Sequence, residues 1–151
     1  MSDAMSQNSD FVTVTVAKQL FGIPVLKVQD ILGPQRITRI PLAPPEVAGA
    51  LNLRGRIVTA IDVRSRLRLP PRAAGDEGMA VVVEHDQELY SLLIDSVGDV
   101  LSLSESKFER NPTTMDALWR EVSVGIYRLK DELMMVLDVD RLLAIEKAIA
   151  A

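Results

Sequence analysis

Two related stretches of sequence, residues 49–62 and 125–138, constrain the fold more than any other feature. The first reads GALNLRGRIVTAID and the second GIYRLKDELMMVLD, and each runs from a glycine through two apolar segments to a closing aspartate. Upstream, residues 20–32 align with residues 89–101, although the offset there is 69 residues rather than 76. An insertion or deletion between the paired segments absorbs that difference. The sequence therefore predicts an internal duplication, with two copies of a unit of roughly 70 residues.

The apolar pattern of both copies is typical of β-structure. Residues 11–18 alternate between apolar and polar side chains, as expected of a strand with one buried face. Residues 57–61 and 133–137 are apolar on both faces, apart from Thr59, which predicts strands that are covered on both sides. About ten short strands separated by turn residues favour an all-β fold. Closure of each copy into a small five-stranded barrel would remove its exposed edges, so we expect two barrels, one for each copy, that share a core.

Polar and turn-rich segments set the expected boundaries. Residues 1–10 are polar and are predicted to be a flexible N-terminal tail, which leaves residues 11–151 as a single domain made of two subdomains. A stretch rich in Pro, Gly and Ala near residues 70–78 falls at the seam of the duplication. We expect the two subdomains to meet at this seam.

Short helices are expected to connect the strands. Asp62 and Asp138 each follow an apolar strand, where an aspartate suits the N-cap of a helix. Residues 44–48 begin with two prolines and precede Gly49, a pattern that predicts one helical turn. Residues 139–150 have a usable apolar side and predict a C-terminal helix.

The composition excludes several classes of protein. There is no cysteine, which rules out disulfides, thiolate metal sites and cysteine nucleophiles. No apolar run approaches the eighteen residues that a transmembrane helix needs. The first ten residues lack the hydrophobic core of a signal peptide. We therefore expect a cytoplasmic protein.

Charge is distributed unevenly along the chain. Residues 31–72 carry eight arginines against two acidic residues, whereas residues 73–151 carry seven basic and sixteen acidic residues. A polarised surface of this kind favours oriented docking to a partner. Arginines are also the ordinary way to solvate strand edges and turns, and the sequence alone leaves both interpretations open.

Little in the sequence points to a catalytic, metal-binding or phosphate-binding site. The only histidine, His85, falls in a polar hairpin turn, where we expect a solvated side chain rather than a metal ligand or a catalytic base. Neither a phosphate-binding glycine loop nor a calcium loop is present. The alternative to a non-enzymatic adaptor is a small β-barrel that binds nucleic acid through the arginine-rich residues 36–72. That alternative is weakened because no aromatic residue lies between residues 22 and 89, and single-strand binding depends on stacking aromatics.

Several motifs resemble those of the CheW family of chemotaxis coupling proteins, and together they extend over nearly the whole chain from Phe11. They are KVQDILG at residues 27–33, TRIP at 38–41, NLRG at 52–55, IVTAIDVR at 57–64, LLIDSVGDVLSL at 92–103 and VLDVDRLL at 136–143. Their order and spacing are specific, although NLRG alone would not be. Thr59 and Ser91 depart from the proline and glycine usual in the family, and Asp30 replaces the commoner glutamate.

The resemblance implies a fold of two small five-stranded SH3-like β-barrels packed together, in agreement with the duplication. It implies a scaffold without catalytic activity, cofactor or metal, which links methyl-accepting chemoreceptors to a CheA-type histidine kinase. Such a protein would be cytoplasmic and would join membrane-bound receptor arrays only through its partners. Neither nucleic acid binding nor direct membrane insertion is implied.

The resemblance also implies a contact region for the receptor and the kinase. Its residues in this chain are Val28, Asp30, Thr38, Gly49, Asn52, Arg54, Gly55, Val97 and Val100. We expect Asp30 and Arg54 to pair, which would orient the guanidinium for a partner, and Gly55 to take a turn position with positive φ. A purely structural role for Arg54, and core positions for the three valines, remain open from the sequence.

Overall fold

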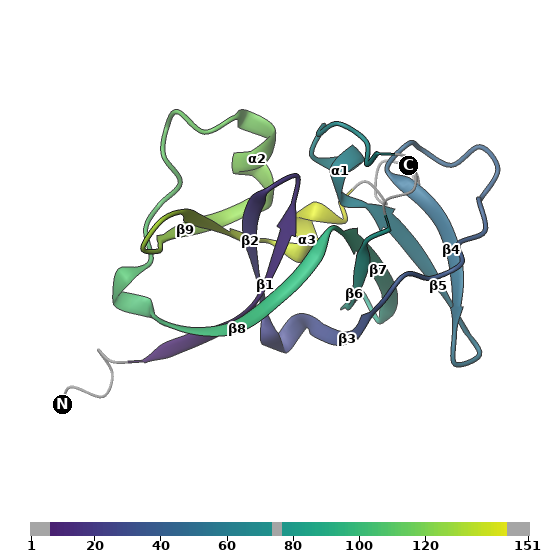
Figure 1. Cartoon of the computed structure of the whole chain (residues 1–151), viewed down its shortest axis with the longest axis horizontal. Helices are drawn as coiled ribbons and strands as arrows, with labels where there is room; N and C mark the ends of the chain where they lie inside the picture. The colour runs from purple at the N-terminus through teal and green to yellow at the C-terminus, as the bar shows by residue number, and fades with distance from the viewer. Residues whose placement is uncertain (1–6, 74–76, 145–151) are drawn as a thin grey trace.

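The computed structural model describes residues 7–73 and 77–144 (Figure 1). The strands in this part of the chain are β1 (Asn8–Val16), β2 (Gln19–Pro24), β3 (Val28–Leu32), β4 (Val47–Leu53), β5 (Arg56–Asp62), β6 (Met79–His85), β7 (Glu88–Ile94), β8 (Ser96–Ser104), β9 (Ser123–Arg128) and β10 (Leu133–Leu137). Short helices connect them: η2 (Val25–Lys27), α1 (Val63–Arg66), η3 (Glu105–Lys107), α2 (Ala117–Val122) and α3 (Val139–Leu142). The all-β prediction with short connecting helices is confirmed. Among the described residues no helix has both the length and the apolar composition that a membrane span requires.

The strands form two five-stranded sheets. Sheet 1 has the order β8-β1-β2-β10-β9, and sheet 2 has the order β3-β6-β7-β5-β4. If each strand is replaced by its counterpart in the other copy (β1 by β6, β2 by β7, β3 by β8, β4 by β9 and β5 by β10), one order becomes the other. The parallel pair of each sheet follows the same rule, since β2 pairs with β10 and β7 pairs with β5. The duplication predicted from the sequence is therefore present in the topology.

The expectation that each copy forms its own sheet is wrong. Sheet 1 combines β1 and β2 from the first half of the chain with three strands of the second half, and sheet 2 combines β6 and β7 with three strands of the first half. Each copy thus places its first hairpin in the sheet of the other. The chain passes between the sheets at η2 and again between β7 and β8. Residues 70–78 are the seam of the duplication but not a border between subdomains, because the strands before and after them both belong to sheet 2.

A shared core joins the two sheets. It contains fully buried side chains from both of them, including Val14, Phe21 and Leu137 of sheet 1 and Ile61 and Leu92 of sheet 2. Burial of each large aliphatic side chain contributes about 1.5–3 kcal/mol, so separation of the sheets would expose much of the stabilising surface. The helix α3 lies between the sheets at this core (Figure 1).

The strand β10 shows how each sheet also keeps a core of its own. Met134 and Val136 pack in a cluster whose buried residues all belong to sheet 1, whereas Met135 and Leu137 point into the shared core. Since side chains alternate along a strand, one strand serves both cores. The prediction of a strand covered on both faces is confirmed for most of β10, although Leu133 at its start is 43% exposed.

Two predicted boundaries are corrected. The strand β1 begins at Asn8 and pairs with β8 from that residue, so the end of the tail predicted over residues 1–10 belongs to a strand. Residues 44–48 do not form a helical turn. The Val47 N–H donates to the Pro44 carbonyl in a single turn, and β4 starts at Val47. The predicted C-terminal helix begins at Val139 as expected but ends at Leu142, with Leu143 as its C-cap, and the predicted part beyond residue 144 lies outside the described residues.

Candidate functional site

The predicted pair of Asp30 and Arg54 is present in the structure. Asp30 lies in β3 and Arg54 in the turn between β4 and β5, so the pair connects opposite edges of sheet 2. The distance from Arg54 Nη2 to Asp30 Oδ2 is 3.0 Å, and the side chains are 77% and 25% exposed, respectively. An ion pair with so exposed a guanidinium contributes little stability, about 0–1 kcal/mol. Its main effect is to hold a cation at a defined place on the surface.

The turn that carries Arg54 has a defined geometry. Arg54 has φ of 52° and Gly55 has φ of 84°, the pattern of a two-residue type I′ hairpin loop. The Gly55 N–H donates to Asn52 Oδ1 at 2.9 Å, which closes the turn from within. The prediction that Gly55 takes a turn position with positive φ is confirmed. The turn thereby fixes the direction in which the Arg54 side chain leaves the hairpin.

Thr38 and Gly49 lie where a loop crosses the edge of sheet 2. Thr38 and Ala50 exchange two backbone hydrogen bonds, each of 2.8 Å. Gly49 is buried with φ of 150°, and a Cβ atom there would collide with the Thr38 carbonyl oxygen. Only glycine lets the two backbones approach this closely. Gly49 therefore acts on the surface indirectly, by seating the segment that carries Thr38.

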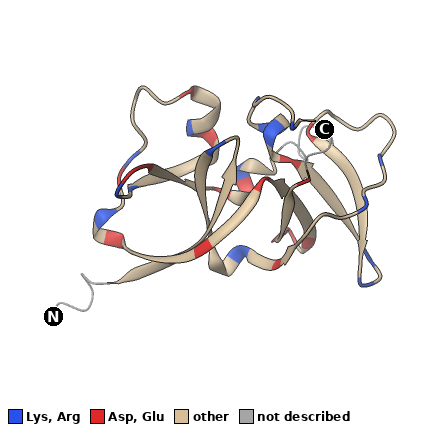
Figure 2. Cartoon of the chain, in the orientation of Figure 1, with Lys and Arg blue, Asp and Glu red and all other residues tan. Residues whose placement is uncertain are grey.

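A shallow groove beside this crossing is the candidate docking surface. Its lining includes Gln35, Arg36, Thr38, Ala50, Asn52 and Ile57. Ile57 is 73% exposed, which corrects the expectation that residues 57–61 are covered on both faces. Basic residues mark the neighbouring tip of the β4–β5 hairpin (Figure 2). An apolar side chain with a polar and cationic rim suits recognition of another protein.

The three candidate valines are not equivalent. Val28 in β3 and Val97 in β8 are half-buried and pack against the shared core, so each has a structural role. Val100 is 60% exposed and is not a core residue. Val97 and Val100 lie in sheet 1, whereas the other seven candidate residues lie in sheet 2, in its β4–β5 turn or in the segment bonded to its edge. The structure therefore does not gather the candidates on one sheet.

The arginines of the first half serve different purposes. Arg64 makes two bonds to the Asp95 carboxylate, at 3.1 and 2.7 Å, and Arg66 donates to the carbonyl oxygens of Leu142 and Arg141 at the end of α3. The hydrogen bond from Arg64 is the main reason that the pKa of Asp95 lies below its ordinary value. These arginines join the two sheets. The exposed arginines of this region are Arg36, Arg39, Arg54, Arg56 and Arg68, and the basic surface is smaller than the sequence predicts.

The aromatic side chains give no support to nucleic acid binding. Phe11, Phe21, Tyr90 and Tyr127 are buried, and Trp119 packs against Phe21 and donates to the Leu67 carbonyl. Phe108 is 39% exposed but stands beside Tyr127 of sheet 1, whereas the candidate groove belongs to sheet 2. A stacking surface next to the exposed arginines is therefore absent from the described residues.

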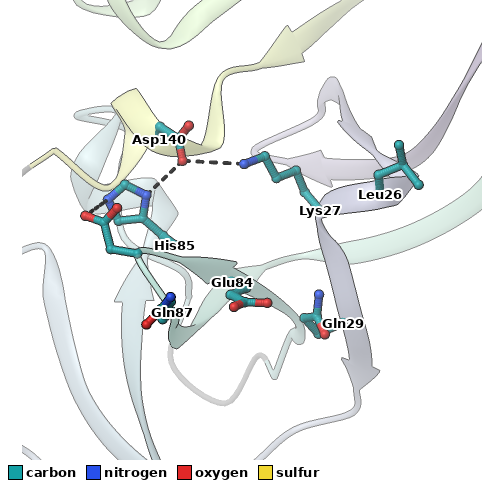
Figure 3. A pocket seen from close by; sticks show the side chains of 8 residues that line it. Leu26, Lys27, Gln29, Glu84, His85, Gln87 and Asp140 are labelled. Carbon is teal, nitrogen blue, oxygen red and sulfur yellow. Dashed lines mark hydrogen bonds and ion pairs between the residues drawn. The ribbon is translucent and has the colours of Figure 1, made fainter.

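The prediction that His85 is a solvated turn residue is wrong. His85 is the last residue of β6, and its side chain is only 10% exposed. Its Nδ1 lies 2.8 Å from Asp140 Oδ1, and its Nε2 lies 3.3 Å from Asp86 Oδ2 (Figure 3). Lys27 Nζ reaches the same Asp140 oxygen at 3.6 Å. The hydrogen bond from His85 is the main reason that the pKa of Asp140 is lowered.

No local signal in the sequence could have found this cluster, because His85 and Asp140 are 55 residues apart and meet only through the packing of α3 between the sheets. The cluster lines a polar pocket but does not resemble a metal centre. Within residues 7–73 and 77–144, no group of three or more His, Asp or Glu side chains is placed to hold a metal ion.

Known proteins resemble this chain over most of its length. Chemotaxis protein CheW of Klebsiella aerogenes is 30% identical over 138 residues, which are 91% of this chain and 83% of that protein. Chemotaxis protein CheW of Bacillus subtilis is 28% identical over 134 residues, 87% of this chain and 84% of that protein. The crystal structure of the scaffolding protein TtCheW from Thermoanaerobacter tengcongensis superposes with a TM-score of 0.80 and 26% identity, covering 90% of this chain and 92% of that one. The CheW-like domain matches residues 10–147, and the chain therefore belongs to the CheW-like family.

Proposed function

We propose that this protein is a non-catalytic scaffold of a chemotaxis system, which links methyl-accepting chemoreceptors to a CheA-type histidine kinase. Family membership supports the proposal, as do the chemotaxis proteins and the scaffolding protein that the chain resembles. The location that follows is the cytoplasmic side of a receptor array, reached through the partners rather than by membrane insertion.

The observation that carries the proposal is the turn of Asn52, Arg54 and Gly55 with its partner Asp30. A guanidinium held by a fixed turn and a single ion pair contributes little stability. The same guanidinium can bind a carboxylate of a partner in a defined orientation. Recognition is therefore a better explanation of this arrangement than stability.

The duplication gives the scaffold two related surfaces. The edge strands β3 and β8 are counterparts in the two sheets, and both carry candidate residues next to the shared core. A helical receptor segment could lay its apolar ridge against one of these surfaces while the kinase binds elsewhere on the molecule. Simultaneous binding of two partners requires no chemistry from the scaffold.

The first test is replacement of Arg54. Arg54→Ala should leave the free energy of unfolding within about 1 kcal/mol of the wild-type value, because the lost ion pair is exposed. The same variant should sediment less with receptor-containing membranes and kinase. The matched control is Arg120→Ala, which removes an exposed arginine from α2 beside sheet 1 and should keep wild-type co-sedimentation.

The outcome separates recognition from structure. Normal co-sedimentation of Arg54→Ala together with a large loss of stability would assign Arg54 to the fold. Failure of the wild-type protein to sediment with receptor and kinase from its own host would reject the proposed function itself.

A further inference from the structure

The duplication creates two equivalent junctions between the sheets. At junction 1, Arg64 of α1 binds Asp95, which follows β7, and Asp95 Oδ2 accepts from the Ala17 N–H in the β1–β2 turn at 2.7 Å. Arg72 adds a contact of 3.4 Å to the same carboxylate. The groups that hold this junction are arginines and a carboxylate, which all stay charged around neutral pH.

Junction 2 is built from the counterparts of these elements but from different side chains. Asp140 in α3 occupies the position of Arg64 in α1. His85 at the end of β6 and Asp86 in the β6–β7 turn replace the β1–β2 turn. The crossing segment is η2, which contributes Lys27. Figure 3 shows Asp140 between His85 and Lys27, with each contributed by a different element.

The geometry at His85 places a carboxylate beside each ring nitrogen. Both ring nitrogens lie against carboxylate oxygens, at 2.8 Å from Asp140 and 3.3 Å from Asp86. A neutral imidazole has only one N–H, so it can donate to one carboxylate and must turn a lone pair toward the other. The imidazolium donates to both.

The other groups around the ring are also charged or polar. Glu84 lines the same pocket, and Tyr90 of β7 stands 6.1 Å from the imidazole, with its hydroxyl directed at Glu88. Lys27 opposes a second proton on the ring, but its side chain is 42% exposed and its contact with Asp140 is longer. The nearest partners of the ring are therefore two carboxylates.

We propose that junction 2 is a proton-dependent latch between the sheets, closed by the imidazolium form of His85 and loosened when the ring carries one proton. Junction 1 holds the sheets at every pH in this range, so the latch changes the stability of one junction and not the fold.

The latch operates within a window of pH. Loss of the second imidazole proton removes one of the two hydrogen bonds that the ring donates, and this sets the upper limit. The lowered pKa of Asp140 keeps its carboxylate charged below the ordinary range, and this sets the lower limit. Since η2 leads directly into β3, a loosened junction would also free the start of the strand that carries Val28 and Asp30.

Amide hydrogen exchange tests the latch at both junctions in one sample. The reporters of junction 2 are the N–H groups of Leu142 and Leu143, which donate within α3. Their protection factors, corrected for the intrinsic exchange rate, should fall roughly tenfold between pH 6 and pH 8, as expected for loss of one charge-assisted hydrogen bond. Protection of the Ala17 N–H at junction 1 should not change over the same range.

Two variants test whether the pH dependence comes from His85. His85→Gln should show the lower protection of α3 at both pH values and no pH dependence. Asp86→Asn alters a side chain that is 77% exposed, so it should fold normally and show a smaller pH dependence than the wild-type protein. The single histidine also gives one imidazole signal in NMR spectra, and at pH 6 both of its ring N–H protons should be protected from exchange with water.

Constant α3 protection from pH 6 to pH 8 in the wild-type protein would overturn the proposal. The same would follow if His85→Gln kept the wild-type pH dependence, or if the two junctions lost protection in parallel.

Discussion

Equivalent glycines occupy a close backbone approach in each copy of the duplication. Gly49 faces the Thr38 carbonyl, and Gly125 faces the Glu109 carbonyl, where an added Cβ would lie 2.6 Å from the oxygen. In both copies the loop residue is bridged to the residue after the glycine. The motif glycine is thus explained by a physical requirement of the fold, although it was predicted from family resemblance as a contact residue.

Three Gly→Ala variants separate backbone strain from steric collision. Gly33→Ala meets neither, because the φ of Gly33 is not in the left-handed range and an added Cβ would have no atom within 4 Å. The free energy of unfolding should therefore change by no more than about 1 kcal/mol. Gly55→Ala meets only the strain of a positive φ and should cost about 1 kcal/mol. Gly49→Ala meets strain and collision with a backbone carbonyl and should cost about 2–4 kcal/mol.

Urea denaturation of the three glycine variants measures this order. Equal stability of the Gly33 and Gly49 variants would show that the loop carrying Thr38 moves away without cost.

Removal of the Ser91 hydroxyl is expected to stabilise the protein, unlike the glycine replacements. Ser91 is fully buried in β7, and its Oγ has no hydrogen-bond partner in the structure. An unpaired buried hydroxyl costs about 1–3 kcal/mol, so Ser91→Ala should raise the free energy of unfolding by about 1 kcal/mol. Ser102→Ala, an exposed change in β8, is the control. A destabilised Ser91→Ala protein would mean that the hydroxyl finds a partner in solution.

At the scale of elements, the Asp95 carboxylate makes the stability of junction 1 sensitive to acid. Its pKa is lowered, chiefly by the hydrogen bond from Arg64, so it contributes stability above the unfolded pKa of about 3.8. That contribution is lost as the pH falls through the lower pKa of the folded state. Asp95→Asn should therefore cost about 2–3 kcal/mol at pH 7, and the difference from wild type should shrink below about pH 4.

Denaturation curves at pH 7 and at pH 3.5 test this dependence. A difference between Asp95→Asn and wild type that stays constant at the two pH values would contradict an ionised Asp95 as its source.

Elements that depend on local rules could be predicted from the sequence. Asp62 and Asp138 cap helices as predicted, by accepting from the N–H groups three residues later, at 3.2 and 3.1 Å. The helical turn predicted over residues 44–48 does not form, because Val47 pairs with Ile61 in sheet 2. The hydrogen bonds of the sheet outweigh the local preference of these residues for a helix. The burial of His85 could not be predicted, since its partner comes from a distant helix.

At the scale of the whole molecule, sequence similarity between two copies does not say which copy pairs with which. The same ten strands could form two separate sheets or two sheets that exchange hairpins, and each strand would have the same apolar pattern in either arrangement. The structure has the exchanged arrangement, in which β1 and β2 join the strands of the second copy. Which of the two arrangements forms depends on contacts across the seam, and the apolar periodicity within one strand carries no information about those contacts.

The exchanged arrangement makes a prediction about fragments of the chain. A fragment of residues 1–73 contains the hairpin of β1 and β2 without the other strands of sheet 1, and it contains β3, β4 and β5 without the central pair β6 and β7 of sheet 2. An isolated hairpin is at best marginally stable, and the shared core would be exposed. The fragment should therefore lack a cooperative thermal transition, and so should the fragment of residues 77–151.

Mixed in equal amounts, the two fragments should form a folded complex, because together they supply every strand of both sheets. Circular dichroism of each fragment and of the mixture, with the intact chain as control, measures this. The intact chain should unfold in one transition, since removal of either sheet exposes the core that contains Phe21 and Ile61. A fragment that folded cooperatively by itself would mean that one copy can close its own sheet, as the simpler interpretation of the duplication assumed.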